Sequence, residues 1–235
     1  MSFACFVVRY FANSESPMPR GLFITFEGTE GCGKSTQVEL LARRLGDLGC
    51  RVRPVREPGG TAIGEEIRHT LKHSRHNQAM TAETELLLMN ASRAQLVREV
   101  IRPALAAGEI VLGDRFYDST VAYQGYGRQL DLQTVRTVID IAVGETRPDL
   151  TVLLTVPPEI SEFRRALRQS TLPFVRDRIE EADRDFFARV ARGYEAIATA
   201  EPERVRRVDA SGPVEIVCAK IWEMVQPLLS KVSQR

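Results

Sequence analysis

The sequence has no paired-cysteine motif, no apolar run long enough to cross a bilayer and no excess of charge of either sign. The cysteines Cys5, Cys32, Cys50 and Cys218 form no C-x-x-C pair, which excludes a zinc ribbon and a thioredoxin-type site. Lys and Arg total 32 against 31 Asp and Glu, so no nucleic-acid or membrane partner is predicted. Any anionic ligand must be held locally, and scattered cysteines favour free thiols in the cytoplasm.

What remains is ordinary for one globular domain. The chain has 235 residues, of which 43% are hydrophobic and 27% charged. Residues 1–18 lack the basic start and cleavage pattern of a signal peptide, and a second methionine, Met18, stands shortly before the first predicted strand. We therefore expect residues 1–18 to be a disordered extension outside the core and residues 19–235 to form a single domain.

Short apolar runs alternate with longer amphipathic segments. Strands are predicted over residues 22–27, 52–56, 110–114, 150–156 and 205–209. Helices are predicted over residues 34–48, 64–72, 82–107 (where Pro103 is a candidate for a break), 132–143, 158–169, 182–200 and 214–229, and residues 170–175 read as a loop. This order predicts an α/β fold with a five-stranded parallel sheet covered by helices on both faces. Ligands bind such sheets beyond the carboxyl ends of the strands.

The segment after the first predicted strand fits the motif G-x-x-x-x-G-K-[ST]. It reads Gly28-Thr29-Glu30-Gly31-Cys32-Gly33-Lys34-Ser35 and lies between a strand and a helix, as the motif requires. Backbone N–H groups of such a P-loop surround a polyphosphate at a helix N-terminus. We expect residues 28–36, ending at Thr36, to bind ATP, with Lys34 on the β- and γ-phosphates and Ser35 on Mg²⁺. The motif predicts the three-layer P-loop NTPase fold, but it does not separate kinases from other NTPases.

Further stretches carry a resemblance to one family. They are Arg56-Glu57-Pro58-Gly59-Gly60-Thr61, Asn90-Ala91-Ser92-Arg93-Ala94-Gln95, Asp114-Arg115-Phe116, the run from Ser119 to Gly125, Arg147-Pro148-Asp149-Leu150 and Asp177-Arg178-Ile179-Glu180. Together with the P-loop they resemble the bacterial thymidylate kinases, within the nucleoside monophosphate kinases. The resemblance implies transfer of the γ-phosphoryl group of ATP to dTMP, giving dTDP and ADP for dTTP biosynthesis. It also implies a homodimer, with residues 86–88 as a candidate contact.

The resemblance implies a role for each matching residue of an acceptor pocket. Arg115 would bind the dTMP phosphate, and Glu30 would lie near the 3′-hydroxyl. Arg93 would hydrogen-bond thymine, and Tyr123 would lie beneath the deoxyribose, where a 2′-hydroxyl would clash. The other implied acceptor contacts are Glu57, Pro58, Met89, Ser119, Thr120 and Gln124.

Phosphoryl transfer depends on positive charge around the moving group. The resemblance implies that Asp114 acts near Mg²⁺ together with Ser35, through water. Eukaryotic relatives carry an arginine inside the P-loop, where this chain has Gly31, so a basic lid at about residues 164–180 is expected to supply the cation. The lid arginines are Arg164, Arg165, Arg168, Arg176 and Arg178, and the predicted catalytic residues are Lys34, Arg115 and either Arg168 or Arg176.

One departure from the family pattern leaves the substrate open. Met89 stands where the family usually has an aromatic residue on thymine, and a thioether stacks more weakly on a base. A kinase for another deoxynucleoside monophosphate is therefore an alternative, and a nucleotide-gated switch without transfer activity is another. Arg93, Arg115 and Tyr123 favour a kinase, because a switch has no need of an acceptor pocket.

Overall fold

The computed structural model describes residues 20–171 and 183–233. Its strands are β1 (Phe23–Glu27), β2 (Val52–Arg56), β3 (Ile110–Asp114), β4 (Leu150–Thr155) and β5 (Val205–Asp209). They form one sheet in the order β2-β3-β1-β4-β5, and every pairing is parallel. The predicted five-stranded parallel sheet is confirmed. Because Phe26 pairs with Asp114 and Glu27 with Leu153, the carboxyl ends of the three central strands meet at one edge.

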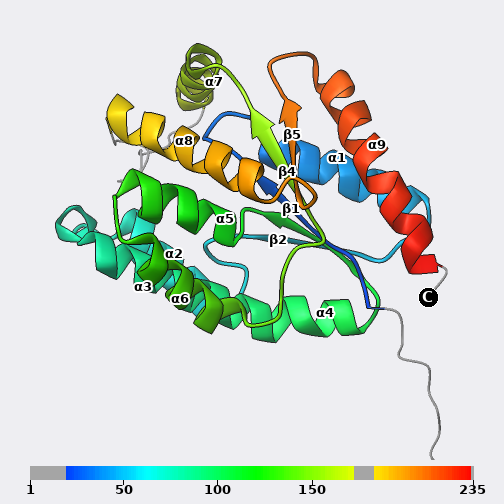
Figure 1. Cartoon of the computed structure of the whole chain (residues 1–235), viewed down its shortest axis with the longest axis horizontal. Coiled ribbons are helices and arrows are strands. Elements are labelled where there is room, and N and C mark those ends of the chain that lie inside the picture. The colour runs from blue at the N-terminus through cyan, green and yellow to red at the C-terminus, as the bar shows by residue number, and fades with distance from the viewer. Residues whose placement is uncertain (1–19, 172–182, 234–235) are drawn as a thin grey trace, which may run out of the picture.

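Helices cover both faces of this sheet (Figure 1). One face packs on α1 (Lys34–Asp47) and α9 (Val214–Ser233), through a core that includes Ile24 and Phe26 of β1. The other face carries α2 (Ala62–His73), α3 (Ala82–Leu96), α4 (Arg102–Ala106), α5 (Tyr117–Thr120), α6 (Leu132–Val143) and α8 (Arg184–Ala200). The helix α7 (Pro158–Thr171) follows β4. In the described ranges no helix is long and apolar enough to cross a membrane.

Several boundaries differ from the sequence prediction. The helix predicted over residues 82–107 does not break at Pro103; it continues from α3 through a π-helical turn, η2 (Val97–Ile101), into α4. A proline removes one backbone donor and crowds the preceding turn, and a π-turn absorbs both effects without ending the helix. The residues Ser170 and Thr171, predicted as loop, form the last turn of α7.

Three short elements were not predicted. They are a 3₁₀ turn, η1 (Asn77–Ala79), the helix α5, and a π-helix, η3 (Val121–Gly127). The segment η3 contains two glycines, which weaken any helical pattern in the sequence. It is held by packing on α8, where a Cβ at Gly127 would come within 2.6 Å of Phe186 and one at Gly193 within 2.9 Å of Tyr126. Tertiary contact therefore fixes η3, which carries two residues of the candidate site.

The N-terminal extension at 1–18 lies outside the described residues, and so does the larger part of the expected lid. Residues 164–171 of that lid belong to α7. The domain boundary at residue 19 therefore stays a prediction.

Candidate active site

The P-loop connects β1 to α1 in the conformation that the motif predicts. Gly28, Gly31 and Gly33 have φ angles of 134°, 77° and 95°, which residues with a Cβ rarely adopt. A Cβ at Gly31 would also lie 2.8 Å from the carbonyl oxygen of Ser161 in α7. The first turn of α7 thus rests on the loop, and Ser161 Oγ donates a hydrogen bond of 2.6 Å to the Glu30 carbonyl.

Lys34 closes the loop on itself. Its Nζ donates to the carbonyl oxygens of Gly28 and Thr29 at 3.1 Å and 2.9 Å, and it lies 3.5 Å from Cys32 Sγ. Cys32 is 1% exposed and packs in the core beneath the loop. The lysine is therefore held at the place where a polyphosphate would replace the carbonyls as its partner.

Ser35 and Asp114 bring two side-chain oxygens together beside the P-loop. Ser35 Oγ donates a hydrogen bond of 2.5 Å to Asp114 Oδ2 at the end of β3. Among the described residues no group of three His, Cys, Asp or Glu forms a metal cluster. Mg²⁺ in phosphoryl-transfer sites takes few protein ligands and fills its shell with phosphates and water, so this oxygen pair fits a nucleotide-bound Mg²⁺.

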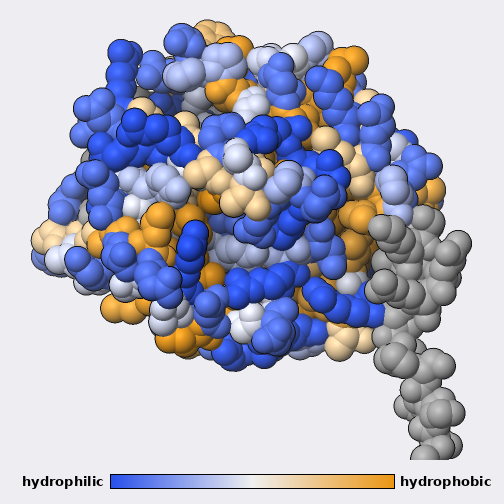
Figure 2. Space-filling model, viewed as in Figure 1, coloured by the Kyte–Doolittle hydropathy of each residue, from blue (hydrophilic) through white to orange (hydrophobic). Residues whose placement is uncertain are grey.

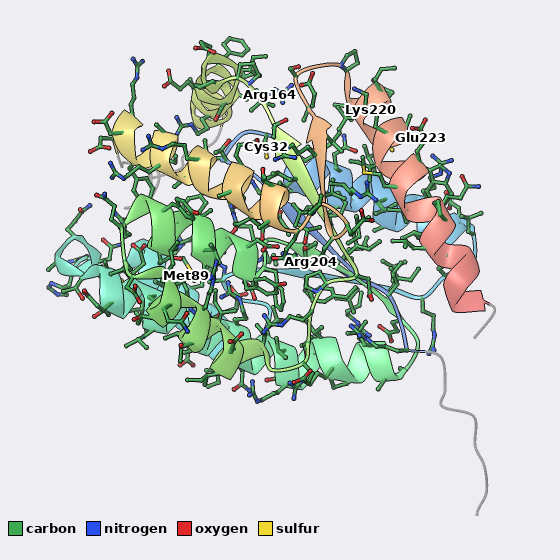
Figure 3. The ribbon with its side chains drawn as sticks, in the orientation of Figure 1. Cys32, Met89, Arg164, Arg204, Lys220 and Glu223 are labelled. Atoms are coloured by element: carbon green, nitrogen blue, oxygen red, sulfur yellow. The ribbon has the colours of Figure 1, made fainter. Side chains whose placement is uncertain are left out.

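A pocket with about 500 Å³ of empty space opens next to the P-loop. Every acceptor contact implied by the resemblance lines it: Glu30, Glu57, Pro58, Met89, Arg93, Arg115, Ser119, Thr120, Tyr123 and Gln124. The pocket also includes Lys72 of α2, which the sequence did not single out. Met89 reaches the pocket from α3, which lies in the helical layer on the same face of the sheet as α8 (Figure 3). Segments far apart in the sequence therefore converge on one cavity.

Arg93 forms a rigid wall of this pocket. Its side chain is 2% exposed, and its Nη2 donates to Glu57 Oε2 at 2.6 Å. The remaining N–H groups point to Glu57, Asn90 Oδ1, Thr120 Oγ1 and the Phe116 carbonyl. Burial raises the pKa of Glu57, and the charge of Arg93 offsets part of this effect. All five donors of the guanidinium are engaged, so a hydrogen bond to a base requires one of these contacts to exchange.

Arg115 joins the pocket to the P-loop. Its Nη2 donates to Glu30 Oε1 at 2.7 Å, and Tyr123 donates to the other oxygen of Glu30 at 2.7 Å. Burial opposes ionisation of Glu30, but the charges of Arg115 and Lys34 prevail and lower its pKa. The Arg115 and Glu30 side chains are 17% and 14% exposed, so this ion pair is open to the pocket. A cation beside a P-loop, facing a cavity, is suited to bind a second phosphate.

Two residues that support Arg115, one through a direct hydrogen bond and one through shared hydroxyl partners, were missed by the sequence analysis. They are Glu27, the last residue of β1, and Tyr194 of α8. A charged residue at the end of an otherwise apolar strand was the available signal for Glu27. Tyr194 carried no signal, because its distance in sequence from the motifs hides its position.

The described part of the lid places two of its arginines. Arg164, in the middle of α7, donates to the carbonyl oxygens of Ala210 and Ser211 after β5 (Figure 3). Arg165 lies with its guanidinium carbon 5.0 Å from the centre of the Phe187 ring. The side chains of Arg168, Arg176 and Arg178 lie outside the described part, so the identity of the catalytic lid arginine stays a prediction.

Comparison with known proteins assigns the family. The family model described as thymidylate kinase matches residues 26–221. A thymidylate kinase of Synechococcus sp. (strain JA-3-3Ab) is 46% identical over 208 residues, covering 88% of this chain and 97% of the relative. One of Desulforudis audaxviator is 47% identical over 210 residues, covering 89% and 92%.

A solved structure agrees with these relatives. The crystal structure of thymidylate kinase from Ehrlichia chaffeensis is 31% identical, with a TM-score of 0.70, and the match covers 88% of this chain and 99% of that one. On the family model, the relatives and the shared fold together, the chain belongs to the thymidylate kinase family of P-loop nucleotide kinases.

Proposed function

We propose that the P-loop binds ATP and the adjacent pocket binds dTMP, so that the γ-phosphoryl group passes between them to give dTDP and ADP for dTTP biosynthesis. The observation that carries this proposal is the Arg115–Glu30 ion pair of 2.7 Å, which joins the two sites. Because the acceptor is already a phosphate oxygen, positioning and charge neutralisation are the main tasks of the protein.

The acceptor is held by the pocket residues. Arg115 binds the phosphate of dTMP through its guanidinium fork, and Glu30 accepts a hydrogen bond from the 3′-hydroxyl. Tyr123, which is 5% exposed, lies against the deoxyribose. The Arg93–Glu57 pair shapes the end of the pocket that receives the base, and Met89 packs on that base.

The donor is held by the P-loop. Lys34 exchanges the carbonyls of Gly28 and Thr29 for phosphate oxygens when ATP enters. Ser35 and Asp114 would hold Mg²⁺, which when bound neutralises charge on the β- and γ-phosphates. A lid arginine, Arg168 or Arg176, supplies the remaining positive charge.

Two variants test the division of labour between the sites. Arg115→Gln should raise the KM for dTMP at least about tenfold, the loss expected for one charged hydrogen-bonding group, and leave the Kd for ATP unchanged. Lys34→Met should weaken ATP binding and leave dTMP binding unchanged. Isothermal titration with each nucleotide separates the two, and an Arg115 variant that loses ATP instead of dTMP contradicts the assignment.

We also propose a homodimer that acts in the cytoplasm. Of the candidate contact at residues 86–88, Leu86 is 3% exposed and belongs to the core, so it is not a contact; Leu87 is 59% exposed. Ile141 of the neighbouring α6 is 72% exposed, and hydrophobic patches lie over α2, α3 and α6 in Figure 2. The described cysteines are free, which agrees with a reducing compartment. Light scattering after gel filtration should give twice the chain mass.

A further inference from the structure

Glu27 is a buried carboxylate beside the acceptor site, and none of the roles above uses it. Side chains alternate along a strand, so Glu27 shares the face of Phe23 and Thr25, toward α5 and α8. Its exposure is 0%. Burying a carboxylate is costly unless its oxygens are fully paired. The hydrogen bonds that surround Glu27 are therefore the first feature to establish.

Four donors surround the Glu27 carboxylate. Oε1 accepts from the backbone N–H groups of Phe116 at 2.7 Å and Ser119 at 3.3 Å. Oε2 accepts from the hydroxyls of Ser119 at 2.6 Å and Tyr194 at 2.9 Å. An ionised carboxylate has about four lone-pair sites, so the charged form is fully satisfied here.

The same two hydroxyls hold Arg115. Its Nη1 donates to Ser119 Oγ at 3.0 Å and to Tyr194 OH at 3.2 Å. Each hydroxyl therefore accepts from the guanidinium and donates to Glu27. The charge of Glu27 orients both hydroxyls so that their lone pairs face Arg115.

Glu27 also fixes the backbone beside Arg115. Arg115 has a φ of 73°, a left-handed conformation that is unfavourable for a non-glycine residue. The next N–H, that of Phe116, is bound by Glu27, and the N–H of Arg115 itself is bound by the Phe26 carbonyl at 3.0 Å. The backbone and the side chain of Arg115 are thus both held from the end of β1.

The two acids near Arg115 differ in access. Glu30 faces the pocket, so a phosphate is able to replace it as the partner of Nη2. Glu27 is sealed behind Ser119 and Tyr194, so the two hydroxyls that accept from Nη1 keep their places when a phosphate binds.

We propose that Glu27 is a positioning residue of the acceptor site, which holds Arg115 through Ser119 and Tyr194 in the orientation that receives the acceptor phosphate. The inference rests on the proposed function, because it takes Arg115 as the phosphate ligand. Tyr194 is the second member of this arrangement and links α8, which follows the lid in sequence, to the same arginine.

The surrounding charges make the arrangement sensitive to pH. Burial and the nearby Asp118 raise the pKa of Glu27 to about 7, although Arg115 and the hydrogen bonds oppose them. Asp118 is itself paired with Arg204 at 2.7 Å. Glu30, Tyr123 and Tyr194 complete the set of ionisable groups around Arg115.

The test compares Glu27→Gln, Tyr194→Phe and the double variant with the natural chain. An amide places an N–H₂ against donors, so Glu27→Gln should raise the KM for dTMP about tenfold or more and leave the Kd for ATP unchanged. Tyr194→Phe removes one of the two bridges and should raise the same KM by a smaller factor, about threefold to tenfold. The double variant should be no worse than Glu27→Gln, because both changes act through one arrangement.

A matched control is Thr25→Val, on the same strand face. It removes a buried hydrogen bond between Thr25 and Thr151 of 2.8 Å, away from Arg115. It should lower stability without changing the KM for dTMP. A change in ATP and dTMP binding alike in Glu27→Gln would indicate a merely structural role and overturn the inference.

The pH dependence of dTMP affinity is a second measurement, which a purely structural role of Glu27 would not change. The affinity for dTMP should fall between pH 7.5 and pH 6 more steeply in the natural chain than in Glu27→Gln, as measured by titration. Protonation of the dTMP phosphate itself, with a second pKa of about 6, is common to both and cancels in the comparison. Equal slopes would contradict the inference.

The Arg115→Gln variant separates the two possible failures. If Arg115→Gln weakens dTMP binding while Glu27→Gln and Tyr194→Phe do not, the inference fails and the proposed function stands. If Arg115→Gln leaves dTMP binding intact, the proposed phosphate site itself fails. If Glu27→Gln does not fold, Tyr194→Phe carries the test, since tyrosine and phenylalanine differ only in the hydroxyl.

Discussion

Two arginine–glutamate pairs in the same pocket differ in what they are able to do. In the Arg93–Glu57 pair the side chains are 2% and 5% exposed, and the guanidinium has no donor left. In the Arg115–Glu30 pair the side chains are 17% and 14% exposed and face the cavity. We interpret Arg93 as a structural residue of the pocket wall and Arg115 as the cation that exchanges Glu30 for a phosphate.

The buried pair predicts a large effect on stability. Glu57→Gln leaves the charge of Arg93 buried without its partner and should lower the free energy of unfolding by about 3–5 kcal/mol. Urea unfolding followed by circular dichroism measures this. Asp140→Asn, which breaks the exposed Arg147–Asp140 pair, is the control and should cost less than about 1 kcal/mol. Equal losses in the two variants would show that burial does not set the cost.

Glu27 predicts the dependence of stability on pH. Its pKa is raised from 4.5 to about 7 in the folded protein, so the folded state holds a proton that the unfolded state has already lost. This contribution to stability is complete below pH 4.5 and is lost as the pH rises toward 7, on the order of 3 kcal/mol at about 1.4 kcal/mol per pKa unit.

Glu27→Gln has no such proton to lose. The difference in unfolding free energy between the natural chain and the variant should therefore shift in favour of the variant between pH 5 and pH 7.5, in denaturant titrations at several pH values. A constant difference over that range would mean that Glu27 titrates at its ordinary pKa.

Ten of the residues that line the pocket could be named from the sequence, but the contacts that support them could not. Arg115 and Glu30 stand in motifs whose spacing carries them to the ends of neighbouring strands. Tyr194 is 79 positions from Arg115, and only the packing of α8 brings them to 3.2 Å. Lys72 comes from a helix whose rotation about its axis the sequence pattern left open.

At the scale of elements, the contact between η3 and α8 is the feature that the site depends on. The π-helix η3 carries Tyr123 and Gln124 of the pocket and packs on the helix that follows the lid. Gly127 and Gly193 allow this close approach, since a Cβ at either would come within 3.0 Å of the opposite element. A shift of α8 is therefore expected to displace η3 and, with it, Tyr123.

Gly127→Ala tests this coupling. The added methyl would lie 2.6 Å from Phe186 and 2.9 Å from Val190, so it should lower stability by about 1–3 kcal/mol and raise the KM for dTMP. Thermal unfolding and initial rates measure the two effects. Gly46→Ala in α1 is the control, because nothing lies within 4 Å of its Cβ. It should raise stability by about 0.5–1 kcal/mol through helix propensity and leave the KM unchanged.

The strands were predicted well because each is a short β-rich run bounded by turn residues. The helices α5 and η3 were not, because their sequence, with Gly125 and Gly127, has no helical periodicity. They form because α6 and α8 pack on them. The continuation of the helix past Pro103 likewise depends on a local π-turn, which composition does not reveal.

At the scale of the whole molecule, the domain boundary predicted at residue 19 is open to a direct test. The Synechococcus thymidylate kinase aligns over 97% of its own length but 88% of this chain, and the family model begins at residue 26. We therefore predict that a chain starting at Met18 keeps the kcat and melting temperature of the full chain. Loss of folding or of activity in that shorter chain would place residues 1–17 in the working enzyme.

The pocket is assigned to dTMP, which receives the γ-phosphoryl group of the ATP bound at the P-loop. The measurement that tests this assignment most directly is a coupled assay of ADP formation with Mg·ATP and the acceptors dTMP, dUMP, dCMP, dGMP and ribosyl-TMP. We expect the highest kcat/KM for dTMP and a low value for ribosyl-TMP, whose 2′-hydroxyl would clash with Tyr123. A clear preference for another acceptor, with Met89 as the first residue to change, or ATP binding without transfer to any acceptor, would contradict this assignment.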